Sequence, residues 1–411
     1  MTSVTIDHMI ALTMFLAVVL LSIGAYSQIM GAATIQQQNH HVTMKADELA
    51  NSILLNPGYP AYWGIRNSLP SAFGLQDSDV GGYALSPFSL QRLVSSSQSL
   101  VYYPKTGLWY SNDSLGGGGV SLVPVNNAVN YTTAAKMLGV NGSYGFQIVI
   151  TPTLNVSISE TDLNPLRLKV YVRGPGLVLT GATLKYFLYH AIPGGGQGPS
   201  IEALSGTNQT DSTGSAILRF PSVDGSKNAY SIVVYASLGG LRGVGYRSRQ
   251  TLTNNQVIPF IEDFEKGTVI LAHSYDVHTF EPPVSALHFN VTFFVITQNF
   301  ELRQIQLANS SEFLNSGLLN YGEGKPYLRT QIPTESEGIL ILAYKSGNDY
   351  GIVMMPWGIN TLGFSVTFGG DPSNADWIAT ELRQMTVDGI SYQVKLAVWN
   401  LKGRQIWRYN P

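Results

Sequence analysis

The sequence contains no cysteine among its 411 residues. This absence excludes disulfides, thiolate nucleophiles and cysteine-ligated metals together, so stability must come from packing and hydrogen bonds. Charge is also scarce, because only 12% of the residues are Asp, Glu, Lys or Arg, about half the share usual in soluble proteins. A formal net charge of -2 gives no overall basic field, and we therefore expect no nucleic acid partner.

Motifs for catalysis are missing as well. We find no Ser nucleophile elbow, P-loop, dinucleotide-binding glycine fingerprint or His-Glu-x-x-His helix. The glycine runs at 116–119 and 194–196 lack the flanking residues of a phosphate cradle. His273 and His278 would face opposite sides of a strand, and with Asp276 they make a poor metal site. We predict no enzymatic activity, no cofactor and no metal.

A long apolar run near the N-terminus is the most prominent feature that is present. The segment from Met9 to Tyr26 carries no charge, and the next charged residue is Lys45. About 20 helical residues span the roughly 30 Å of membrane hydrocarbon. Because no basic segment precedes the run and its cleavage site is poor, we expect a retained anchor rather than a secretory signal.

The helix is predicted to continue beyond the membrane. Residues of one face recur at alternating four- and three-residue steps: Ile35, Asn39, Val42, Ala46, Leu49 and Ile53. Pro57 and Pro60 then stop a helix of ~75 Å that begins near Ile6. The extended face calls for a partner, either the protein's own body or other copies of the helix.

The first 64 residues resemble archaeal type IV pilin-like surface proteins. The matching stretches are SVTIDHMIALTMFLAVVLLSIGAYSQ and ADELANSILLNPGYPAYWG. The resemblance implies a helix that leaves the membrane for the core of an extracellular filament. It also implies that Asp7, fifth in a chain beginning at Ser3, neutralises the terminal amine of a neighbouring subunit. The predicted membrane and assembly residues are Asp7, Met9, Phe15, Leu20, Ile23, Ile35, Val42, Leu49 and Ile53.

The remainder of the chain reads as a β-rich body. Residues 57–145 are predicted to form a loop-rich connector with a short helix that begins at Ser86. Period-two alternation from Phe146 predicts half-buried strands and a sandwich over 146–252. Within it, the order of the TDSTGSA turn at 210–216 and the YSIVV strand at 230–234 resembles immunoglobulin-like or transthyretin-like repeats, which implies a spacer or adhesive module.

Residues 253–411 are predicted to form a C-terminal β domain. Its clearest element is a hairpin over 383–399, in which Asp388-Gly389 fits a two-residue type I′ turn. The connector and this region either form separate units or one head with the sandwich inserted. With the helix over 1–56, the predicted fold class is α+β and mainly β: a long N-terminal helix followed by antiparallel sandwich domains.

Seven Asn-x-Ser/Thr sequons lie beyond the helix and agree with an external body. The candidate N-glycosylation sites are Asn112, Asn130, Asn141, Asn155, Asn208, Asn290 and Asn309.

Together these features favour a structural cell-surface protein with a membrane anchor and an extracellular, adhesive body. The first hypothesis is a type IV pilin-like subunit or minor subunit of an extracellular filament, whose partners are the membrane and other pilin-like subunits. The alternative is a permanently anchored surface adhesin or envelope-associated protein that does not polymerise. A third hypothesis, an exported binding protein or hydrolase on an anchor with carbohydrate as its ligand, rests on six tryptophans.

Overall fold

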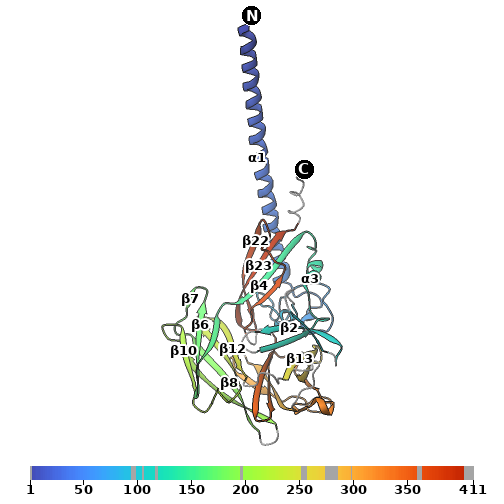
Figure 1. Ribbon diagram of the computed structural model, residues 1–411, viewed down its shortest axis with the longest axis vertical. Coiled ribbons are helices and arrows are strands. Elements are labelled where there is room, and N and C mark those ends of the chain that lie inside the picture. Colours follow the sequence, from blue (N-terminus) through green and yellow to red (C-terminus); the bar gives the residue numbers. More distant parts are fainter. Residues whose placement is uncertain are drawn as a thin grey trace.

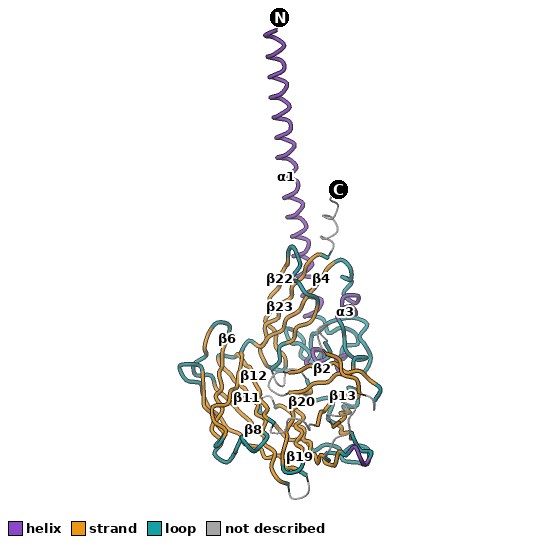
Figure 2. The backbone as a smooth tube through the Cα atoms, in the orientation of Figure 1, coloured by secondary structure: helices purple, strands orange, loops and turns teal. Residues whose placement is uncertain are grey.

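A single long helix, α1 (Thr2–Leu54), projects from a body of five β-sheets, as the ribbon in Figure 1 and the tube in Figure 2 show. At ~1.5 Å per residue the helix is ~80 Å long. This arrangement confirms the predicted fold class of one N-terminal helix followed by mainly antiparallel strands. The computed structural model describes residues 2–93, 99–103, 106–115, 119–194, 198–250, 257–273, 286–297, 299–358 and 363–401, and the sheets are counted over these residues.

Helix α1 ends just before Pro57, Gly58 and Pro60, as these residues predicted. The side chain of Asn56 accepts a hydrogen bond from the Gly58 amide at 2.8 Å, and Gly58 has φ +80°, which glycine adopts easily. The chain then returns to the helix end. The Leu75 amide donates to the Ile53 carbonyl at 2.7 Å, and the Gln76 amide donates to the Asn56 carbonyl at 3.1 Å. The bond to Ile53 satisfies one of the terminal carbonyls that a helix leaves open.

One sheet lies against the end of α1 and is called the helix sheet. Its strand order is β21 (Val366–Gly369), β4 (Tyr144–Pro152), β23 (Ile390–Asn400) and β22 (Ile378–Val387). Strands β22 and β23 contact α1. They form the predicted hairpin, in which Val387 pairs with Ile390. Asp388 and Gly389 have φ values of 44° and 75°, as a type I′ turn requires.

The largest sheet combines strands from the predicted connector and the C-terminal region. Its order is β1 (Ser99–Tyr103), β2 (Leu108–Leu115), β3 (Gly119–Pro124), β20 (Asp349–Trp357), β19 (Gly338–Ser346), β15 (Leu287–Ile296) and β16 (Leu302–Ile305), with β17 (Ser316–Leu319) also paired to β15. A smaller sheet contains β13 (Val257–Asp263), β14 (Thr268–His273) and β18 (Tyr327–Gln331). Buried side chains of β13 and β14 pack against those of β1, β2 and β3.

The structure therefore differs from the predicted connector over 57–145. Neither β1 (SLVYY) nor β2 (LWYSNDSL) alternates regularly between apolar and polar residues, so the period-two pattern did not reveal these strands. The region also holds a 3₁₀ helix, η1 (Trp63–Ile65), and two short α-helices, α2 (Pro87–Gln91) and α3 (Tyr131–Met137). Ser86 caps α2 as predicted, accepting a bond from the Ser89 amide at 3.3 Å. Another 3₁₀ helix, η3 (Tyr321–Glu323), lies in the C-terminal region.

The buried guanidinium of Arg92 holds the connector together. It is fully buried and donates to the backbone carbonyls of Trp63, Arg66 (2.7 Å), Ser68 (3.0 Å) and Asn127 (2.7 Å). Burial lowers the pKa of Arg92 to about 10, although the charge of a nearby glutamate opposes this shift. Four carbonyl acceptors stabilise a cation that has left water.

The sandwich consists of two facing sheets with an immunoglobulin-like strand order. One sheet contains β5 (Asn155–Leu163), β6 (Leu166–Gly174) and β10 (Ser215–Phe220), with β7 (Leu177–Val178) paired to β6. The other contains β12 (Leu241–Arg249), β11 (Tyr230–Leu238), β8 (Thr183–Pro193) and β9 (Pro199–Gln209). Their inner faces form one apolar core that includes Leu168, Val170 and Ile232.

The predicted sandwich also included β4, and here the structure again differs. β4 pairs with β21 and β23 of the helix sheet instead. Alternation identifies a strand but does not say which sheet it joins, because both sheets bury every second residue. Strands on both sides of the sandwich in sequence thus pair with each other, which is the arrangement expected for an inserted domain.

Glu160 links the two sheets of the sandwich along one edge. Its carboxylate in β5 accepts bonds from the Tyr230 hydroxyl (2.8 Å), from Arg247 Nε (3.0 Å) and from Arg249 Nη1 (2.9 Å). Burial alone would raise the pKa of Glu160, but the hydrogen bonds from Tyr230 and Arg247 and the two positive charges lower it overall. The charged form of Glu160 therefore stabilises the sandwich.

Candidate functional site

Helix α1 has an exposed part and a buried part. Side chains from Ile6 to His41 are exposed, except Val19 and Asn39, which are half-buried. The predicted membrane and assembly residues in this part all lie open, including Met9, Leu20 and Ile35, which are 67%, 65% and 59% exposed. Asp7, Phe15 and Ile23 are exposed too. We call Ile6–His41 the exposed segment.

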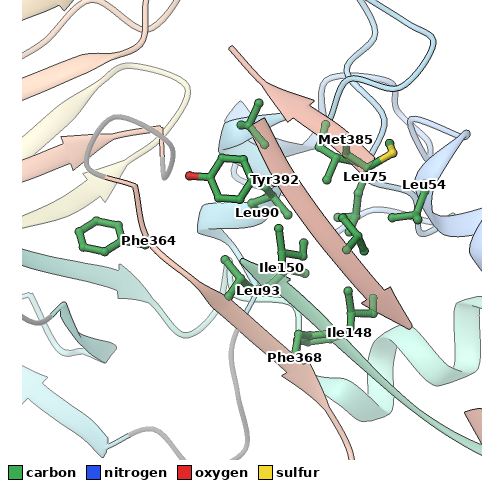
Figure 3. Packing of buried hydrophobic residues seen from close by; sticks show 14 of the residues in the cluster. Leu54, Leu75, Leu90, Leu93, Ile148, Ile150, Phe364, Phe368, Met385 and Tyr392 are labelled. Atoms are coloured by element: carbon green, nitrogen blue, oxygen red, sulfur yellow. The ribbon is translucent and has the colours of Figure 1, made fainter. Parts of the chain in front are cut away.

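The last turns of α1 belong to the core of the body. Their buried residues are Val42, Ala46, Leu49, Ala50, Ile53 and Leu54. Figure 3 shows Leu54 beside Leu75 and Met385, in the cluster that also contains Tyr392 of β23. At the rim, Arg383 Nη2 of β22 lies 2.8 Å from Asp47 Oδ1. Of the two partners considered for the amphipathic face, the body covers Val42, Leu49 and Ile53, whereas Ile35 remains uncovered.

Three hydroxyls of the exposed segment are satisfied within the helix itself. The hydroxyls of Thr13, Ser22 and Thr34 each donate at 2.8 Å to the backbone carbonyl four residues earlier. Between Met9 and Met44 the sequence carries no Asp, Glu, Lys or Arg. An uncharged helix stretch in which these three hydroxyls donate to the helix itself suits an apolar environment, either lipid or other apolar helices.

The exposed segment is longer than a membrane span requires. It covers ~54 Å at ~1.5 Å per residue, against roughly 30 Å of hydrocarbon. Its final part, from Thr34 to His41, is neutral and polar, with Gln36, Gln37 and Gln38 in succession. Among the described residues, α1 is the one helix long and apolar enough to cross a membrane. The sequence thus places an uncharged spacer between the apolar part and the body.

The candidate glycosylation sites differ in access. Asn130, Asn141, Asn155, Asn208 and Asn309 are exposed. The side chain of Asn112 lies outside the described residues. Asn290 is half-buried beside a cavity of about 590 Å³, and its Nδ2 donates to the Pro199 carbonyl at 3.3 Å.

The structure describes only part of the residues considered for metal or carbohydrate binding. His273 is buried in β14, while Asp276 and His278 lie outside the described residues. In the described part of the chain, no three His, Asp or Glu side chains are arranged to hold a metal. Among the tryptophans, Trp63 and Trp357 are fully buried, and Trp109 is 52% exposed.

The comparisons with known proteins do not identify a family. No protein-family model and no curated protein matches the chain. Among solved structures, the D0-D1 domain of intimin is 13% identical, with 54% of this chain and 98% of that chain covered, at a TM-score of 0.19. A TM-score this low carries no argument, and the immunoglobulin-like order described above rests on the strand pairing of this chain alone.

Proposed function

We propose that this chain is a non-enzymatic cell-surface protein, anchored or assembled through α1, that carries its β-rich body outside the cell. Within that role we propose a type IV pilin-like subunit of an extracellular filament. The single observation that supports both levels is the division of α1 into a buried end and an exposed segment of ~54 Å that is mainly apolar as far as Ala33.

The exposed segment cannot remain in water. Each large apolar side chain left uncovered forgoes about 1.5–3 kcal/mol of burial free energy, and Met9, Phe15, Leu20 and Ile23 are all at least 60% exposed. Two environments can cover them, namely lipid and copies of the same helix. A subunit that passes from the membrane into a filament would use both environments in turn.

The length and rigidity of α1 favour assembly over simple anchoring. An anchor needs only about 20 residues, and a flexible linker could follow it. Here the helix continues without interruption into the body, where Val42 to Leu54 fix its direction. A rigid apolar rod of this kind can pack in register against its copies through helical ridges and grooves.

The test combines the mature N-terminus with the location of cross-links. The chain lacks cysteine, so Ser27→Cys in the exposed segment and Ser212→Cys in an exposed turn of the sandwich form a matched pair. We expect sheared surface filaments to begin near Ser3 and to form oxidised multimers with Ser27→Cys, but not with Ser212→Cys.

Other outcomes separate the two levels of the proposal. An intact Met1, found only in detergent-extracted membranes and without cross-linking at Ser27→Cys, would replace the filament subunit by the permanently anchored surface protein. Release of the chain from membranes by alkaline carbonate, together with an absence of filaments, would refute the anchor as well.

A further inference from the structure

The outer face of the β5–β6–β10 sheet carries a cluster of cations. Alternation in β6 points Leu168 and its buried neighbours into the sandwich and the intervening residues outward. Arg219 of β10 is paired directly with Arg167 of β6. We call this surface the basic face, and it consists of Arg167, Lys169, Tyr171, Arg173 and Arg219.

The four cations of the basic face lack acidic partners. Within the described residues, none of them has a carboxylate oxygen within 4.0 Å, whereas Lys185, Arg247, Arg329 and Arg383 elsewhere form ion pairs. Asp162 pairs with Arg167 in strand register but forms no ion pair with it. Four unpaired cations on one small face are notable in a chain with only 12% charged residues.

The spacing of these charges suits an extended polyanion. Alternate residues of a strand lie ~6.6 Å apart, so Arg167 to Arg173 covers ~20 Å in a line. The neighbouring strand β5 adds uncharged hydrogen-bonding groups at the Arg173 end of the same face, while Asp162 of β5 lies opposite Arg167 at the other end. Asn155 pairs with Arg173, and Ser157 pairs with Tyr171. Amide and hydroxyl groups beside a row of cations can bind sugar hydroxyls and acidic groups together.

The aromatic ring on this face is already occupied. Lys169 Nζ lies 4.7 Å from the centre of the Tyr171 ring, and Arg173 Cζ lies 5.5 Å from it. Single-stranded nucleic acids need free aromatic platforms on which their bases stack. Since the ring supports the two cations instead, the face suits a polyanion that has no bases.

We propose that the basic face binds an acidic polysaccharide, one that carries uronate or sulfate groups. Figures 1 and 2 place β6 at the side of the molecule. The other sheet of the sandwich, which contains β8, β11 and β12, lies between β6 and the rest of the body. The face is therefore directed away from α1 and the helix sheet. Contact with a surface polysaccharide rests on the proposed external location of the body, but the binding itself does not.

The test measures binding of a fluorescein-labelled oligogalacturonate to the full chain in neutral detergent, by fluorescence anisotropy. The face variant is Lys169→Gln with Arg173→Gln. The control variant, Arg303→Gln with Lys395→Gln, removes the same charge from exposed positions on other sheets. At about 50 mM salt we expect the face variant to bind at least about tenfold more weakly, with a salt slope lower by nearly 1 per cation removed. The control variant should bind like the wild type.

Competition experiments separate the ligand classes. We expect dextran sulfate to displace the probe and uncharged dextran to leave it bound. No binding at low salt, or equal losses in the two variants, would refute the basic face as a site. Stronger competition by an oligo-dT strand, with a loss on Tyr171→Ala, would overturn the polysaccharide in favour of nucleic acid. Each result is independent of whether the chain forms filaments, because the purified protein is used.

Discussion

The division of α1 at Val42 predicts that two leucines of one helix have separate roles. Leu49 is 2% exposed within the core of the body, while Leu20 is 65% exposed. Leu49→Ala removes buried methyl groups and leaves a cavity, which costs about 2–5 kcal/mol of unfolding free energy. Alanine favours the helix only slightly more than leucine does, so propensity offsets little of this cost. Leu20→Ala removes no contact with the body and should change its stability by less than about 0.5 kcal/mol.

Urea unfolding of the full chain in neutral detergent, followed by near-ultraviolet circular dichroism, measures this difference. We expect a lower unfolding midpoint for Leu49→Ala and an unchanged one for Leu20→Ala. The two variants should also differ in assembly, because only Leu20→Ala changes a residue of the exposed segment. Equal midpoints for the two variants would refute the conclusion that the last turns of α1 belong to the core.

Three further predictions concern groups in the body. Arg92→Ala removes the guanidinium donor from four buried or part-buried carbonyls, of which that of Trp63 keeps a bond from the Arg66 amide, and should cost at least about 3 kcal/mol, while Arg92→Lys should retain part of that stability; thermal unfolding ranks the three proteins. Glu160→Gln should destabilise the sandwich by about 1–2 kcal/mol near pH 7. Because the folded pKa of Glu160 is lowered, this difference should be full above the ordinary glutamate value near 4.3 and vanish as pH falls through the lower folded pKa; unfolding curves over that range test it. In a glycosylating host, glycopeptide mass spectrometry should find Asn141 occupied and Asn290 unmodified, since the Asn290 amide is half-buried and already bonded.

The sequence predicts best those features that depend on neighbouring residues. The apolar run, the stop at Pro57 and the Asp388-Gly389 turn are each encoded within a few positions, and the structure has a helix end and a hairpin there. The same pattern could not show where the body stops covering α1. Ile35 and Val42 both fit one helical face, and only the position of β22 and β23 separates them.

Features that depend on distant pairing were not accessible from sequence. β4 joins β21 and β23, more than 200 residues away, and no local signal distinguishes this sheet from the sandwich. The basic face shows the same limit. The alternation of Arg167, Lys169 and Arg173 is visible along one strand, but only the register of β10 brings Arg219 beside them. A search of the predicted strands for cations at alternate positions could have found the part of the basic face that lies on β6.

The junction between the sandwich and the helix sheet depends on two glycines of β12. A Cβ atom at Gly245 would lie 2.1 Å from the Val156 carbonyl oxygen, and one at Gly243 would lie 2.6 Å from Leu154 Cβ. Only Thr153 and Leu154 separate β4 of the helix sheet from β5 of the sandwich. Because β12 approaches β5 so closely, this edge of the sandwich lies next to β4, the strand of the helix sheet that precedes β5.

Gly245→Ala should accordingly loosen this edge. The methyl group would meet backbone rather than a flexible side chain, so β5 and β12 must separate, and we expect a loss of about 1–3 kcal/mol. Gly322→Ala is the control, because its Cβ would lie 3.5 Å from the nearest atom, Asn320 Oδ1. Hydrogen exchange should become faster in β5 and β12 of Gly245→Ala and stay unchanged in the control. Unaltered exchange in those strands would mean that the sandwich is positioned by its other contacts with the body, and that the glycines of β12 do not set its orientation relative to α1.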